Sequence, residues 1–142
     1  AETLENQNEV IPNTKFSNPI KNIYFNYIKR QNPYSLEAVK DLLNKFKKNI
    51  SLLKGNSNAI LKKIDMSKID FVFLDGGHDY HTVKSDLNSC REVIINGGTV
   101  LCDDYDLTYA PGLKKAIDEF SSDDGIKCSV IYNDRFAKLE KN

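Results

Sequence analysis

Acidic side chains follow two apolar segments of the chain, and a histidine lies close to the first of them. Asp75 directly follows the run FVFL, and His78 comes three residues later. Asp103 and Asp104 directly follow the run TVLC. Runs rich in Val, Leu and Phe favour buried strands, and ligands of open α/β sheets bind at the carboxyl ends of the strands. We therefore expect the three carboxylates and the histidine to share one ligand-binding edge.

Three carboxylates at one edge would suit a divalent cation. Consecutive strands of a βαβ unit usually lie side by side, about 4.8 Å apart, and like charges so close together disfavour one another's ionised forms. Mg²⁺ removes that cost and prefers oxygen ligands. We expect Asp75, Asp103 and Asp104 to bind Mg²⁺. His78 would then take a proton from a hydroxyl held near the metal.

Each of these residues also has a purely structural interpretation. Asp75 could cap a helix after the strand, and Asp103 and Asp104 could be ordinary loop acids. His78 could be a turn histidine, and His81 is assigned to the start of the following helix. Their joint placement after two neighbouring strands favours the functional interpretation.

Strand-like and helix-like segments alternate along the chain. We expect strands at 22–28, 49–54, 69–74 and 99–102, helices at 36–46, 58–64, 83–94 and 111–120, and a closing antiparallel pair at 128–132 and 136–139. This alternation predicts an α/β fold with a mostly parallel sheet covered by helices on both faces. The third and fourth strands are continuous apolar runs, as expected of strands buried on both faces.

Composition limits the classes of partner and compartment. The 142 residues include 20 basic and 20 acidic ones, so no charge excess indicates nucleic-acid binding. No apolar run reaches the roughly 18 residues of a membrane span, and no signal peptide is visible. Cys90, Cys102 and Cys128 have no CxxC spacing, which predicts a cytoplasmic protein without disulfides or zinc. We expect an irregular arm over 1–20 and one domain over 21–142.

Two motifs carry a resemblance to a known family. The segments IDFVFLDGGHDYHTVKSDL and NGGTVLCDDYDLTYAPGLKKAIDEF resemble the C-terminal half of class I S-adenosylmethionine-dependent methyltransferases, most closely the metal-dependent sugar O-methyltransferases of the macrocin and mycinamicin type. The resemblance implies a Rossmann-like fold and S-adenosylmethionine as cofactor. It also implies Mg²⁺-assisted methyl transfer to a hydroxyl of a sugar-like or other small molecule. It gives the metal role to Asp75, Asp103 and Asp104 and the role of base to His78.

The cofactor-binding half of that family is matched only in part. Its members carry a glycine-rich turn after the first strand, but no glycine precedes Gly55 here, so we expect the first strand to be absent. Asn26 stands near the position of the ribose-binding acid, and Asn56 and Ser57 stand in the turn near the adenine. Together with Gly55 and Asp75, these are the cofactor contacts that the resemblance implies. Ser57 could instead cap the next helix.

Other functions have to be weighed against methyl transfer. The chain could be a catalytically inactive remnant that acts as a binding or assembly module, because the gap left by a missing strand invites a partner strand or a homo-oligomer. A haloacid-dehalogenase-like phosphatase fails because Gly77 stands where its second acid belongs. Tyr105 and Tyr109 either line an acceptor pocket or are half-exposed loop aromatics.

Overall fold

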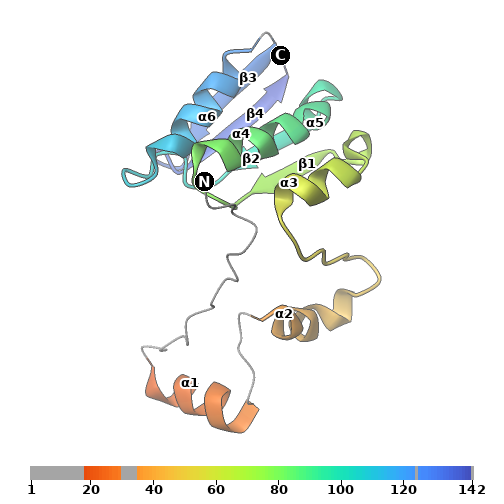
Figure 1. The fold of residues 1–142 in the computed structure, drawn as a ribbon, viewed down its shortest axis with the longest axis vertical. Helices are drawn as coiled ribbons and strands as arrows, with labels where there is room; N and C mark the ends of the chain where they lie inside the picture. Colours follow the sequence, from red (N-terminus) through yellow and green to blue (C-terminus); the bar gives the residue numbers. More distant parts are fainter. Residues whose placement is uncertain (1–17, 30–34, 124, 142) are drawn as a thin grey trace, which may run out of the picture. The chain divides into compact units, whose positions relative to one another are not determined.

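The computed structural model describes residues 18–29, 35–123 and 125–141. The chain divides into two compact units, Ala1–Lys54 and Gly55–Asn142 (Figure 1). All but the last three residues of the arm expected at 1–20 lie outside the described residues. None of the described helices is long and apolar enough to cross a membrane.

The first described element of the first unit is a helix, which runs into the segment where a strand was expected. The helix α1 (Pro19–Ile23) continues into the π-helical segment η2 (Tyr24–Lys29). Asn18 caps α1, because its side chain accepts a hydrogen bond from Ile20 N at 2.9 Å, and the proline at the first helical position needs no partner for a backbone N–H. The strand predicted at 22–28 is therefore wrong. Strand preference depends on neighbouring strands, and none of the residues described in this unit forms one.

A second capped helix follows in the first unit. α2 (Leu36–Leu43) begins after Ser35, whose side chain accepts a hydrogen bond from Ala38 N at 3.2 Å, so the predicted helix and its cap are confirmed. The short helix η3 (Asn44–Phe46) extends it. The strand predicted at 49–54 is wrong, because this segment has no ladder partner among the described strands.

The second unit alternates helices and strands in the predicted order. Its elements are α3 (Ser57–Ile60), η4 (Leu61–Lys63), η5 (Met66–Lys68), β1 (Phe71–Leu74), α4 (Tyr80–Ser89), α5 (Arg91–Ile95), β2 (Thr99–Cys102), α6 (Pro111–Ser121), β3 (Ile126–Ile131) and β4 (Phe136–Lys141). The single helix expected at 83–94 is divided at Cys90 into α4 and α5. Gly97, with φ +84°, turns the chain from α5 toward β2, as predicted.

The four described strands form one mixed sheet in the order β1-β2-β4-β3. β1 and β2 are parallel, with Phe71 opposite Thr99 and Leu74 opposite Cys102. β4 is antiparallel to both β2 and β3, which confirms the closing antiparallel pair. The prediction of a mostly parallel sheet is wrong for the described residues, because the two segments expected to add further parallel strands do not form strands.

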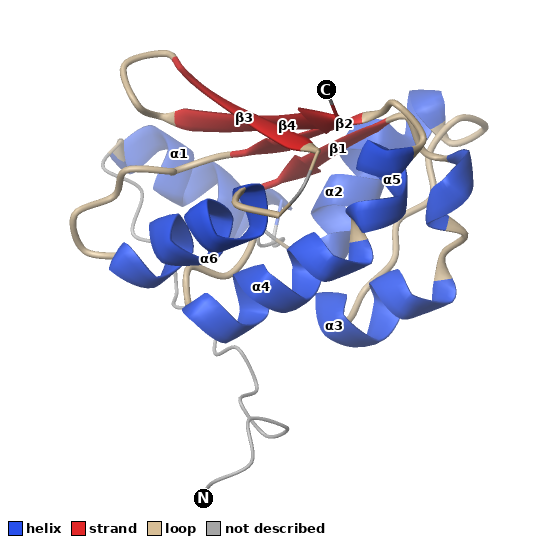
Figure 2. Ribbon diagram, turned by 90° about the horizontal axis from the view of Figure 1, so that it is seen from above, coloured by secondary structure: helices blue, strands red, loops and turns tan. Residues whose placement is uncertain are grey.

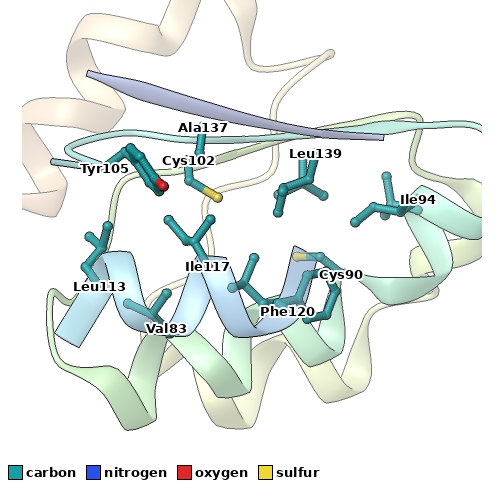
Figure 3. Close-up of a cluster of buried hydrophobic side chains, with 14 of the residues drawn as sticks. Val83, Cys90, Ile94, Cys102, Tyr105, Leu113, Ile117, Phe120, Ala137 and Leu139 are labelled. Atoms are coloured by element: carbon teal, nitrogen blue, oxygen red, sulfur yellow. The ribbon is translucent and has the colours of Figure 1, made fainter. Parts of the chain in front are cut away.

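The helices α4, α5 and α6 lie on one face of the sheet (Figure 2). The core between them includes Val83, Cys90, Ile94, Cys102, Tyr105, Leu113, Ile117, Phe120, Ala137 and Leu139 (Figure 3). On the other face, Phe71 and Phe73 of β1 are 53% and 48% exposed. The prediction that this strand is buried on both faces is therefore wrong, because only the side chains on its inner face pack against the core.

Candidate functional site

The carboxyl ends of β1 and β2 lie side by side, as the sequence predicts. Because Leu74 is opposite Cys102 in the parallel register, the acids that follow the two strands leave the sheet at the same edge. Asp103 continues the pairing, since its N–H donates to Leu74 O at 2.9 Å. Asp75 is exposed and Asp103 is buried, so neighbouring positions on this edge have different surroundings.

Asp103 is held by an arginine from the β3–β4 turn. Arg135 donates from Nε to Oδ1 at 2.8 Å and from Nη2 to Oδ2 at 2.9 Å, while Asp103 is only 6% exposed. Asp104 N donates to the same Oδ1 at 2.8 Å. The Arg135 guanidinium holds the pKa of Asp103 below its usual range. Tyr105 N also donates to Arg135 O at 2.9 Å, which fixes the turn beside the end of β2.

His78 and Asp104 form a partly exposed pair at this edge. Asp104 has φ +59°, a left-handed conformation that Asp adopts more readily than most residues. Its Oδ2 lies 3.2 Å from His78 Nε2, and the two side chains are 31% and 40% exposed. With a proton on Nε2, the ring donates to the carboxylate and Nδ1 keeps a lone pair. The pair thus has the geometry of a general base oriented by a carboxylate.

The three acids do not form the predicted magnesium site. Across 18–29, 35–123 and 125–141, no three His, Cys, Asp or Glu side chains are grouped so that they could hold a metal ion. Both oxygens of Asp103 accept hydrogen bonds from Arg135, whose charge supplies the compensation expected from Mg²⁺. Asp104 contacts His78. In this arrangement the residues do not fit a metal ion.

A narrow cavity of about 20 Å³ lies beside the pair and holds a buried acid that the sequence analysis did not single out. Its lining includes Asp75, Gly76, Gly77, His78 and Asp86. Asp86 is 6% exposed, and none of the described residues forms a hydrogen bond with its Oδ1. Burial raises the pKa of this carboxyl. A space of this size accepts one small polar group, so the residues fit an N–H or O–H donor such as those of S-adenosylmethionine.

The other predicted cofactor residues are divided between the two units. Ser57 Oγ donates to Asp86 Oδ2 at 3.1 Å, so Ser57 is linked to the cavity through that acid. Asn56 caps α3 by accepting from Asn58 N at 2.9 Å, so the cap suggested for Ser57 belongs to Asn56. Gly55 precedes this cap and does not line the cavity. Asn26 lies in η2 of the first unit, and its side chain is outside the described part of the structure.

The aromatic residues after β2 have separate roles. Tyr105 is 8% exposed and donates its hydroxyl to Asp118 Oδ1 at 2.6 Å, so it belongs to the core and neither interpretation offered for it is right. Tyr109 is 77% exposed, as the loop interpretation predicts. His81 lies in the first turn of α4, where it was expected.

Sequence reasoning missed two polar residues of the site. Asp86 lies three residues after Val83 and four before Cys90, so its place on the buried stripe of the helix could have identified it. Arg135 gave no such signal, because its partner Asp103 lies 32 residues earlier and a turn arginine is usually solvated.

Comparison with known proteins identifies the family of the chain. A family model described as a methyltransferase domain matches residues 10–105, which is more than half of the chain. The match includes Asp75, His78 and both acids after β2, and it ends before α6 and the hairpin that carries Arg135. No curated protein and no solved structure matches the chain.

Proposed function

The chain belongs to the family of methyltransferase domains, and we propose that it transfers the methyl group of S-adenosylmethionine to a hydroxyl of a sugar-like or other small hydroxylated molecule. The observation that supports this acceptor chemistry is the pair formed by His78 Nε2 and Asp104 Oδ2, 3.2 Å apart at the carboxyl edge of the sheet. A hydroxyl must lose a proton when its oxygen is methylated. A histidine oriented by a carboxylate is suited to accept that proton.

Each residue of the pair has a distinct part in the proposed reaction. When bound, the cofactor supplies a methyl group on a positively charged sulfur, which is open to attack by an oxygen. His78 removes the proton of the attacking hydroxyl through Nδ1. Asp104 holds the ring by accepting from Nε2–H and stabilises the imidazolium that forms. Holding both reactants at one edge of the sheet contributes further through orientation.

The surface next to the pair suits an acceptor rich in hydroxyls. An open hollow of about 510 Å³ is lined by Asp104, Asp106, Leu107, Asn133, Asp134 and Arg135. Carboxylates and an amide oxygen accept hydrogen bonds from hydroxyls, and a guanidinium donates to them. The proposal contains no metal step, because Arg135 donates to both oxygens of Asp103 and its charge already compensates this carboxylate.

The two histidines provide a matched test. The full chain is assayed for conversion of S-adenosylmethionine to S-adenosylhomocysteine with a panel of methyl glycosides, inositols and catechols, once with Mg²⁺ and once with a chelator. We expect turnover of at least one acceptor at the same rate in both conditions. His78→Gln should lower the rate by about 10²–10⁴-fold. His81→Gln, on the exposed side of α4, should keep it.

Three outcomes would contradict the proposal. Equal rates for the two histidine variants would show that His78 is not the base. Loss of turnover in the presence of the chelator would show that the reaction needs a metal ion. Failure of the wild-type chain to bind S-adenosylhomocysteine in a calorimetric titration would favour the alternative of an inactive binding or assembly module.

A further inference from the structure

We propose that Asp86 is a cofactor-binding residue whose free oxygen, Oδ1, accepts a hydrogen bond from an amino group of S-adenosylmethionine. The inference rests on the proposed function, because it takes S-adenosylmethionine as the ligand. It adds to the site a buried acid on α4, which neither the sequence motifs nor the family match assigns to a role.

One of the two carboxylate oxygens of Asp86 accepts no hydrogen bond from the described residues. The residue is 6% exposed, and its Oδ2 accepts from Ser57 Oγ at 3.1 Å. Oδ1 is buried and has no hydrogen-bond partner within 18–29, 35–123 and 125–141. Among the described residues no cation forms an ion pair with Asp86. A buried polar oxygen without a hydrogen-bond partner is costly, so this position is explained best by a ligand that supplies the missing donor.

The cavity provides room and access for that donor. Asp86 shares its lining with Asp75, His78 and the two glycines after β1, so the acid belongs to the same opening as the proposed base. At Gly76 a Cβ atom would lie 4.0 Å from Asp86 Oδ2, an ordinary contact distance, so the turn after β1 runs beside the carboxylate. The volume of about 20 Å³ admits a group the size of an amine.

An amino group is the best complement for this oxygen. The hydroxyl of Ser57 is neutral, and a hydrogen bond between charged partners is about twice as strong as a neutral one. S-adenosylmethionine carries two amino groups, one on the adenine ring and one on the amino-acid part. Both are N–H donors, and two ligands that differ in the amino-acid part distinguish them.

The test is a calorimetric titration of the full chain with S-adenosylhomocysteine and with 5′-methylthioadenosine, which lacks the amino-acid part. Asp86→Asn and Asp86→Leu are compared with the wild type. Asp79→Asn is the matched control, because this exposed acid caps the same helix and asparagine is an equally good cap. We expect both Asp86 variants to bind S-adenosylhomocysteine at least tenfold more weakly and the control to bind it unchanged.

The outcomes separate the two proposals. If only S-adenosylhomocysteine loses affinity, Asp86 binds the ammonium of the amino-acid part; if both ligands lose it equally, Asp86 binds the adenine amine. Wild-type affinity in both Asp86 variants overturns the inference and leaves the proposed function intact. No binding by the wild type overturns both. Thermal unfolding of each variant confirms that it is folded, so a loss of affinity is not mistaken for a loss of structure.

Discussion

Arg135 donates two hydrogen bonds to Asp103, from Nε to Oδ1 at 2.8 Å and from Nη2 to Oδ2 at 2.9 Å. The pair joins the β3–β4 turn to the end of β2, the strand that Asp103 and Asp104 directly follow. Planar two-point pairing fixes orientation as well as distance. The position of Asp104, which follows directly and contacts His78, therefore depends on an arginine outside the matched methyltransferase segment.

Removal of this arginine should destabilise the protein. In Arg135→Ala the Asp104 N–H is the one described donor left to the buried carboxylate of Asp103, so we expect the free energy of unfolding to fall by about 1–3 kcal/mol in urea titrations. Arg135→Lys should recover part of the loss, because an ammonium cannot make the two-point contact. The control is Arg91→Ala, whose partner Asp123 is exposed, with a loss of about 1 kcal/mol at most. Similar losses at both arginines would contradict the prediction.

The same pair should set how stability depends on pH in the acid range. The pKa of Asp103 is lowered in the folded protein, so folding favours its ionised form. That stabilisation is complete above the unfolded-state pKa of about 3.9 and is lost as the pH falls through the folded-state pKa. We expect the stability difference between wild type and Arg135→Ala to be constant from about pH 7 to pH 5 and to shrink below about pH 4. A difference that persists at the lowest pH at which the protein still folds would rule out this cause.

Most of the second unit could be predicted from local sequence patterns. The segment 99–102 is a strand with the predicted bounds, and the helical stripe from Val83 to Ile94 is buried. These patterns succeed because the residues face a core that adjacent elements of the same unit provide. The segment 22–28 has equally good strand formers, but Asn18 and Pro19 start a helix there, and strand preference is decided by neighbours.

Only the parts of the candidate site that come from consecutive elements of the chain could be predicted from the sequence. Asp75, Asp103 and their shared edge follow from consecutive parallel strands, which the sequence indicates. The predicted grouping of magnesium ligands is not found among the described residues, and the reason lies far away in the sequence. The charge of Asp103 is compensated by a residue 32 positions later. No spacing rule connects the two, because the contact exists only after the antiparallel hairpin has packed beside β2.

Gly98, which precedes β2, should be important for the stability of the protein near the candidate site. A Cβ atom on Gly98 would lie 2.6 Å from Val93 O and 2.7 Å from Asp70 O, both backbone atoms that cannot move without disturbing β1 and α5. We expect Gly98→Ala to lower the free energy of unfolding by roughly 1–3 kcal/mol. At Gly97 a Cβ meets nothing within 4 Å, and its φ of +84° suits asparagine, so Gly97→Asn should cost less. Denaturant titrations of both variants test this, and an equal or smaller loss at Gly98 would contradict it.

The effect of Asp104 on kcat should depend on His78. Asp104→Asn keeps a residue that tolerates the left-handed backbone, but it removes the charge that orients and stabilises the ring. We expect kcat to fall by about tenfold or more in the wild-type background, since the lost contact is a charge-assisted one, and to change little when His78→Gln is already present. Asp123→Asn, far from the site in sequence and paired with Arg91, serves as control and should leave kcat unchanged in both backgrounds. If the effects of Asp104→Asn and His78→Gln on the activation free energy simply add, the two residues act independently and the proposed pairing is wrong.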